Sequence, residues 1–217
     1  MEINMKFCVI GLGRFGYEVA TRLTERGMEV LAIDSNEHII NSIKDKVTQA
    51  ICINIETEDS LLAIGVEQID TVIVAMGENF AQSILITALL KKQLHIPTVI
   101  ARAINTIHSK ILKLVGADKV ISPEKEVGLR LAETLSMPFS EVAHITEKFA
   151  ITQLKAPESF IGQTLEELKL RKIHKVSCIG VKKGTEIVLV NLNYVILEND
   201  ELLFAGENKD LEALAQL

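Results

Sequence analysis

Gly11-Leu12-Gly13-Arg14-Phe15-Gly16 is the stretch that decides the fold. It follows an apolar run, Phe7–Ile10, and opens a helical pattern, which is the strand, turn and helix setting of a dinucleotide-binding loop. Gly11 permits the tight turn, Gly13 lets the backbone approach a phosphate, and Gly16 lets the helix pack close to the strand. Phosphates would bind at the helix N-terminus, where free N–H groups and the helix dipole favour negative charge.

An acidic residue stands where a nucleotide site needs one. A second apolar run, Val30–Ile33, ends at Asp34, 18 residues after Gly16. A carboxylate there can accept hydrogen bonds from ribose hydroxyls. Strand, glycines, helix and acid agree, so the sequence predicts a bound nucleotide. The competing interpretation is that the glycines serve packing alone.

The composition is that of a globular protein and argues against nucleic acid as a partner. Of 217 residues, 48% are hydrophobic and 24% are charged, and the net charge is −6. We find no basic patch, and with no Trp and 4% aromatic residues the chain lacks platforms for stacking bases. No apolar run is long enough to span a membrane, and residues 1–6 do not resemble a signal peptide. We therefore expect a cytoplasmic protein.

The cysteines and histidines show no spacing typical of a metal site. We expect buried, reduced thiols at the three cysteines, which lie in apolar runs: Cys8, Cys52 and Cys178. We expect surface or helix-end positions for the five dispersed histidines: His38, His95, His108, His144 and His174.

Up to about residue 137 the chain alternates apolar runs with helical patterns. The six strand-like runs are Phe7–Ile10, Val30–Ile33, Ala50–Ile53, Thr71–Ala75, Thr98–Ala101 and Lys119–Ile121. Runs that are apolar throughout indicate burial on both faces, and six such units predict an α/β fold with a doubly wound, Rossmann-like parallel sheet. All strand carboxyl ends then share one edge. The segments that gather in its crevice are Gly11–Gly16, Asp34–Asn36, Asn54, Ala75–Asn79, Arg102 and Ser122–Glu124.

The pattern changes after Met137-Pro138, and we expect a small α+β C-terminal domain. The predicted domains are residues 1–137, a linker at 138–145, and residues 146–217. The elements predicted in the second domain are strands at Phe149–Leu154, Val176–Val181, Ile187–Val190 and Leu202–Ala205, and a final helix near Lys209–Leu217. A short helix is indicated by the capping-box spacing of Thr164 and Glu167.

The sequence has a strong nucleotide site and no visible reaction. No nucleophile elbow appears, the glycine loop lacks the Lys-Ser/Thr ending of a Walker A motif, and no acid or base is placed for hydride transfer. This favours a ligand-sensing protein over an enzyme. Arg14, inside the loop, is either a solvated arginine or a cation beside phosphate oxygens. A ligand with an extra terminal phosphate would benefit from the second arrangement.

Four stretches of the chain resemble one family. They are Ile10–Gly16, Ile33–Asn36, Val72–Gly77 and Gly116–Glu124. Together they resemble the regulator-of-K⁺-conductance (RCK) family, which includes the cytosolic Ktr and Trk subunits of potassium uptake systems, and the Gly-Arg-Phe-Gly form is most similar to the KtrA-like members. The likeness covers essentially the whole chain. It implies a nucleotide-binding N-terminal domain and a regulatory C-terminal domain.

The resemblance also implies roles for particular residues. Asp34 and Asn36 would hold the ribose, Asn54 would lie by the adenine, and Arg14 would meet the terminal phosphate of ATP. Glu124 would bind Mg²⁺ or Ca²⁺ between subunits; the alternative is that this acid only complements the dipole of a helix that starts there. The full set of expected cofactor-binding residues is Gly11, Gly13, Arg14, Phe15, Gly16, Asp34, Ser35, Asn36, Asn54, Ala75, Met76, Gly77 and Arg102.

Ligands and partners follow from the same resemblance. The expected cofactor is ATP or ADP, with NAD(H) as the alternative. The expected partners are a membrane K⁺-translocating subunit of the KtrB or TrkH type and further copies of the chain, as homodimers within an octameric ring at the inner face of the membrane. Arg171 belongs to a stretch similar to a cyclic di-AMP site in some relatives, although Val190–Tyr194 departs from the loop usual there, and an ordinary surface arginine is the favoured alternative. An NAD(H)-dependent oxidoreductase or redox sensor, and the gating module of a K⁺ channel or antiporter, remain alternatives.

Overall fold

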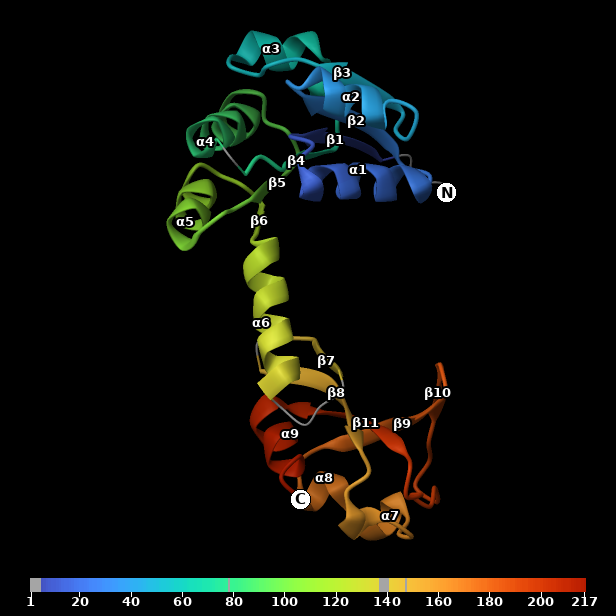
Figure 1. Cartoon of the computed structure of the whole chain (residues 1–217). Helices are drawn as coiled ribbons and strands as arrows, with labels where there is room; N and C mark the ends of the chain where they lie inside the picture. Colours follow the sequence, from blue (N-terminus) through green and yellow to red (C-terminus); the bar gives the residue numbers. More distant parts are fainter. Residues whose placement is uncertain (1–4, 78, 137–140, 147) are drawn as a thin grey trace. The chain divides into compact units, whose positions relative to one another are not determined.

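The computed structural model describes residues 5–77, 79–136, 141–146 and 148–217. The chain divides into two compact units, Met1–Glu124 and Lys125–Leu217, drawn in Figure 1. None of the helices in the described ranges is long and apolar enough to cross a membrane.

The first unit alternates strands and helices, as the sequence predicts. Its strands are β1 (Lys6–Ile10), β2 (Glu29–Asp34), β3 (Gln49–Cys52), β4 (Thr71–Val74), β5 (Thr98–Arg102) and β6 (Lys119–Ile121). Its helices are α1 (Arg14–Glu25), α2 (Glu37–Ile43), α3 (Glu58–Ala63), the 3₁₀ turn η1 (Val66–Gln68), α4 (Phe80–Ala88), the π-helical η2 (Leu89–Gln93) and α5 (Thr106–Leu114). Helix α6 (Pro123–Ser136) begins at the end of this unit.

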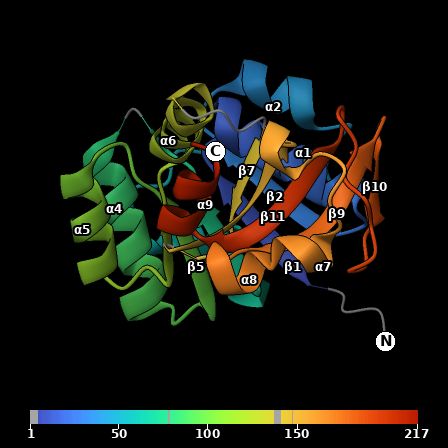
Figure 2. The same cartoon turned by 90° about the horizontal axis from the view of Figure 1, so that it is seen from below.

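The six strands form one parallel sheet in the order β3-β2-β1-β4-β5-β6. The predicted doubly wound, Rossmann-like fold is confirmed. Successive residues of β1 point to opposite faces: Cys8 and Ile10 join one buried cluster and Val9 the other. The first cluster lies under α3, α4 and α5, and the second under α1 and α2. Helices α4 and α5 lie side by side, as Figure 2 also shows.

The second unit contains the rest of α6 and a small antiparallel sheet. The strands are β7 (Glu141–His144), β8 (Phe149–Lys155), β9 (Ser177–Lys183), β10 (Glu186–Leu189) and β11 (Glu201–Glu207), in the order β10-β9-β11-β8-β7. The helical segments are η3 (Glu158–Phe160), α7 (Leu165–Leu168), α8 (Leu170–Ile173) and α9 (Asn208–Leu214). They cover one face of the sheet, with Phe204 and Leu202 at the centre of the buried cluster.

The predicted strands and final helix of this unit are present within two or three residues, and the capping box of Thr164 and Glu167 is formed in both directions. One strand was missed. The predicted linker at 138–145 contains β7, which pairs with β8 through Val142 and Thr152. Residues 138–140 of that linker lie outside the described residues. The chain divides after Glu124, so most of α6 belongs to the second unit.

One prediction about burial is wrong, and one buried side chain was not anticipated. Cys52 is exposed, because β3 is an edge strand and ends at this residue. Cys8 is buried at the centre of the sheet, which raises the pKa of its thiol, and Cys178 is partly buried. His108 is near the start of α5, as expected of a helix-end histidine, but it is fully buried. Its Nε2 lies 3.0 Å from Oγ of Ser83 on α4, and burial lowers its pKa.

Candidate functional site: a nucleotide crevice

The predicted crevice exists at the carboxyl edge of the parallel sheet. The strand order reverses between β1 and β4, and ligands of doubly wound sheets bind at such a switch point. The segments that follow β1, β2, β3 and β4, and the last residue of β5, all meet this edge. Glu78, within the predicted segment Ala75–Asn79, lies outside the described residues.

The glycine loop has the geometry that its sequence predicts. Gly11 has a φ of +90°, where a side chain would be strained. A Cβ on Gly16 would lie 1.9 Å from the carbonyl oxygen of Gly11 and 3.0 Å from Cβ of Ala75. Gly16 and the buried Ala75 therefore set the close packing of α1 on the sheet. A Cβ on Gly13, in contrast, would meet no described atom within 4 Å, so this glycine faces open space.

The N-terminus of α1 is prepared for an anion. Gly13 is the N-cap residue, no described side chain caps this helix end, and its first turn contains no acidic residue. The first N–H groups of a helix need acceptors, and the helix dipole adds a partial positive charge there. Arg14, the first residue of the helix, is exposed. A phosphate group would satisfy these donors.

Asp34 joins the glycine loop to the end of β2. Its Oδ2 accepts a hydrogen bond from the backbone N–H of Leu12 at 2.7 Å, and its Oδ1 accepts one from the N–H of Asn36 at 2.8 Å. Asn36 in turn caps α2, because its Oδ1 accepts a hydrogen bond from the N–H of His38 at 2.9 Å. Asp34 thus holds the loop in place, and its carboxylate oxygens retain acceptor capacity for ribose hydroxyls.

A small cavity of about 50 Å³ lies beside this carboxylate. It brings together five residues that the sequence assigns to the site: Gly11, Asp34, Ser35, Asn54 and Met76. A volume so far below the several hundred Å³ of typical ligand pockets is a slot rather than a full nucleotide pocket. Most of a bound nucleotide would therefore lie in the open crevice.

Sequence reasoning missed Gln82, in the first turn of α4, which also lines the slot. Its Nε2 donates hydrogen bonds to Oδ1 of Asn54 at 2.9 Å and to the carbonyl oxygen of Ile55 at 2.7 Å. The available signal was the spacing of Asn79 and Gln82, because Asn79 caps α4 through the N–H of Gln82. The spacing of Asn79 and Gln82 is typical of any helix N-terminus, so it does not indicate a ligand.

A guanidinium occupies the other end of the crevice. Arg102, the last residue of β5, forms an ion pair with Glu124 through Nη2 and Oε1. Its Cζ lies 5.9 Å from the ring centroid of Phe15, and a Cβ on Gly77 would lie 2.7 Å from its Nη1. The backbone N–H of Glu124 and the guanidinium of Arg102 lower the pKa of the Glu124 carboxyl, and the charge of Arg14 contributes.

The described residues of one chain do not complete a cation site at Glu124. One of its carboxylate oxygens is engaged by Arg102, and no group of three or more His, Cys, Asp or Glu side chains that could hold a metal occurs among the described residues. Mg²⁺ and Ca²⁺ require about six or more oxygen ligands.

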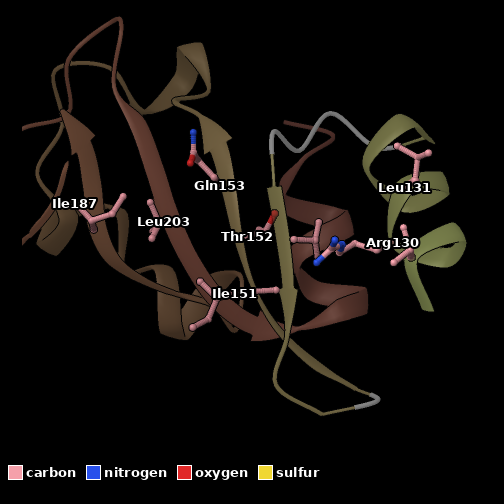
Figure 3. A pocket seen from close by; sticks show the side chains of 10 residues that line it. Arg130, Leu131, Ile151, Thr152, Gln153, Ile187 and Leu203 are labelled. Carbon is pink, nitrogen blue, oxygen red and sulfur yellow. The ribbon is translucent and has the colours of Figure 1, made fainter. Parts of the chain in front are cut away.

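The second unit contains two further hollows. One, of about 530 Å³, lies between α7, α8 and the Asn191 loop, and Arg171 on its wall donates from Nε to Oγ of Ser177 at 2.8 Å. The other, of about 740 Å³, lies between α6 and the sheet face opposite α9. Figure 3 shows Leu131, Ile151 and Leu203 among its lining side chains.

Family models match both parts of this chain. The TrkA-N domain matches residues 7–123 and the TrkA-C domain matches residues 151–217. The chain belongs to the regulator-of-K⁺-conductance family. Ktr system potassium uptake protein A of Bacillus subtilis is 35% identical over 211 residues, which are 96% of this chain and 95% of that protein. The protein of the same name from Vibrio alginolyticus is 34% identical over 208 residues, 95% and 94% of the two chains.

Solved RCK structures share the fold. The GsuK RCK domain matches with a TM-score of 0.66 at 18% identity, over 100% of this chain and 48% of that chain. The GsuK channel bound to NAD matches with a TM-score of 0.57 at 20% identity, over 99% and 38% of the two chains. This RCK chain thus spans less than half the length of these two GsuK chains, and the likeness concerns the fold.

Proposed function

We propose that this RCK protein is a nucleotide-sensing regulatory subunit of a membrane K⁺ uptake system and has no catalytic activity of its own. The observation that carries the proposal is the N-terminus of α1, which no side chain in the described part of the chain caps and which lies beside Gly13 and Asp34. The Ktr relatives, which match over nearly their full length, support a regulatory role in K⁺ transport. A peripheral position on the cytoplasmic face of the membrane is part of the proposal.

The proposed ligand is ATP or ADP. Phosphates would lie at Gly11, Gly13 and the α1 N-terminus, with the ribose at Asp34 and the base near the slot lined by Asn54. Arg14 is exposed beside the loop, where it would meet the terminal phosphate of ATP in the same chain or from a neighbouring copy. GsuK chains bound to NAD and to ADP share this fold, so NAD(H) is the alternative ligand. A divalent cation at Glu124 would need oxygens from the nucleotide or from a second copy.

Assembly into a homo-oligomeric ring is supported by apolar side chains left on the surface. Helices α4 and α5 expose Leu85, Ile107 and Leu114, of which Leu114 is 80% exposed. Exposed apolar side chains that adjoin one another can form a contact surface. We propose that copies of the chain pair through the first unit. The hollow beside Arg171 is where cyclic di-AMP would bind if this chain recognises it.

Ligand-dependent thermal unfolding tests the proposal. A ligand that binds the folded protein alone raises its stability with concentration, so ATP and ADP are expected to raise the unfolding temperature progressively. Stabilisation by NADH alone, together with turnover of a carbonyl substrate, would favour the oxidoreductase alternative. Affinity capture from membranes then separates a transporter partner from a channel or antiporter.

A further inference from the structure

Residues from three separate segments surround the guanidinium of Arg102. Phe15 of the glycine loop lies beneath it, the backbone of Gly77 lies against it, and Glu124 pairs with it. The side chain of Arg102 is only 17% exposed, whereas that of Glu124 is 65% exposed. A largely buried cation needs an anionic partner, and here an exposed carboxylate supplies it.

The ion pair leaves part of this guanidinium unused. Nε of Arg102 is buried and has no hydrogen-bond partner among the described residues. An arginine presents five donors in a planar fork that suits two oxygens of one phosphate. Gly77 leaves room for the fork, since any side chain there would collide with Nη1. A phosphate would offer this fork more charge and more oxygens than the single carboxylate does.

Resting on the proposed function, we infer that Arg102 exchanges partners: it pairs with Glu124 when the crevice holds no nucleotide, and with a phosphate group of the nucleotide when one is bound. Glu124 is then a competitor of the phosphate for one guanidinium, and nucleotide binding releases its carboxylate. Because coupling between two ligands of one group is reciprocal, removing the charge of Glu124 must tighten nucleotide binding.

The test is a double-mutant cycle on ATP affinity, measured by calorimetry in EDTA so that no divalent cation takes part. Glu124→Gln is expected to lower the Kd by about five- to tenfold, the low end of usual coupling factors. Arg102→Gln is expected to raise it by tenfold or more, on the order expected for lost charge-assisted bonds. In the Arg102→Gln background, Glu124→Gln should have no further effect, because the competition acts through Arg102.

Glu25→Gln is the matched control, since it removes an acid of α1 that pairs with Arg22; its Kd should equal that of the wild type. If Glu124→Gln lowers the Kd for ATP by the same factor in the wild type and in the Arg102→Gln variant, Glu124 merely repels phosphate and the exchange is refuted. The exchange is also refuted if Glu124→Gln leaves ATP affinity unchanged or weakens it in a protein that binds ATP well. A wild-type chain that binds no adenine nucleotide would overturn the proposed function as well.

Discussion

The carboxylate of Asp34 accepts a hydrogen bond from the backbone N–H of Leu12 at 2.7 Å, across 22 residues of sequence. This contact joins the acid that should bind ribose to the loop that should bind phosphate. Asp34 therefore has two roles: its hydrogen bond to Leu12 holds the loop, and in the proposed complex it binds the ribose. A substitution that separates the two roles is informative.

Replacing Asp34 by Asn should distinguish them. The amide oxygen of Asn still accepts a hydrogen bond from Leu12, but one carboxylate oxygen becomes a donor group. We expect a small loss of unfolding free energy. The binding of ATP and of ADP should weaken equally, by about 1–3 kcal/mol, which is the range for hydrogen bonds to charged groups. Calorimetry of both nucleotides checks this. A variant that weakens ATP but not ADP would place the ribose elsewhere.

The glycines of the loop offer a matched pair of variants. Gly16→Ala would place a Cβ 1.9 Å from the Gly11 carbonyl oxygen, whereas Gly13→Ala meets no described atom within 4 Å. We expect Gly16→Ala to destabilise the first unit by about 3 kcal/mol or more, as overpacking and backbone shifts do. Gly13→Ala should keep the unfolding midpoint in urea within about 0.5 kcal/mol of the wild type, as surface substitutions do.

The decisive difference between the two concerns nucleotide affinity. If phosphates approach the backbone at Gly13, the added methyl group weakens ATP and ADP binding in a fully folded protein. Unchanged affinity in Gly13→Ala would mean that the open space at this residue is not the phosphate site.

Arg14→Ala should separate ATP from ADP. Arg14 is exposed, so its removal should not affect folding. Loss of one charge-assisted hydrogen bond to a terminal phosphate should weaken the binding of ATP by about 1–3 kcal/mol more than the binding of ADP. Isothermal titration with each nucleotide measures the difference, with Arg26→Ala, at the far end of α1, as a matched control. Equal losses for both nucleotides would refute the role.

Assembly through α4 and α5 predicts the effect of Leu114→Glu. This side chain is 80% exposed, so a charge there should leave the fold of one chain intact and oppose the burial of the helix pair against another copy. Light scattering should show a shift to smaller species at micromolar concentration. Lys44→Glu, at the C-terminal cap of α2 and across the sheet, should leave the assembly unchanged. A wild type that is monomeric with and without nucleotide would remove the basis of this prediction.

The second unit should be sensitive to acid through Asp200, whose side chain is 2% exposed. Burial raises the pKa of this carboxyl, but bonds from Lys183 at 2.5 Å, the N–H of Leu197 at 2.9 Å and the hydroxyl of Tyr194 at 2.7 Å outweigh it, so the pKa lies below its ordinary value. A carboxyl whose pKa is lowered by folding stabilises the folded chain at pH values above its pKa in the unfolded chain, which is near 4. That stabilisation is lost as the pH falls and the carboxyl is protonated.

Asp200→Ala should therefore lower the free energy of unfolding by about 3 kcal/mol at pH 7. The difference from the wild type should shrink as the pH falls below about 4, near the ordinary carboxyl value. Urea unfolding of the full chain at both pH values measures it. A difference that does not change with pH would mean that the charge of Asp200 contributes nothing.

The fold of the first unit could be predicted because its signals are local. Apolar runs such as Val30–Ile33 and the spacing of Gly11, Gly13 and Gly16 report burial and turn geometry directly. Strand β7, Glu141–His144, was missed because it begins and ends with a polar residue and its pairing with β8 is a tertiary contact. The burial of His108 depends on Ser83 of another helix, which no local pattern encodes.

In the crevice, too, the sequence predicts the features with local signals and misses the tertiary contacts. Each predicted residue could be placed at the strand ends from topology alone, because parallel strands share one carboxyl edge. The pairing of Arg102 with Glu124 and the contact of Gln82 with Asn54 join segments far apart in the sequence. Their geometry depends on side-chain conformations that only the folded chain determines.

The central claim is that nucleotide binding to this RCK chain regulates K⁺ transport, and K⁺ flux measures it most directly. The measurement uses vesicles containing the KtrB- or TrkH-like membrane protein of the same organism, with the full chain added and ATP or ADP present. We expect flux to depend on the chain, to be higher with ATP than with ADP, and to lose that difference in Gly13→Ala. Flux that is the same with either nucleotide, or with and without the chain, would contradict the account.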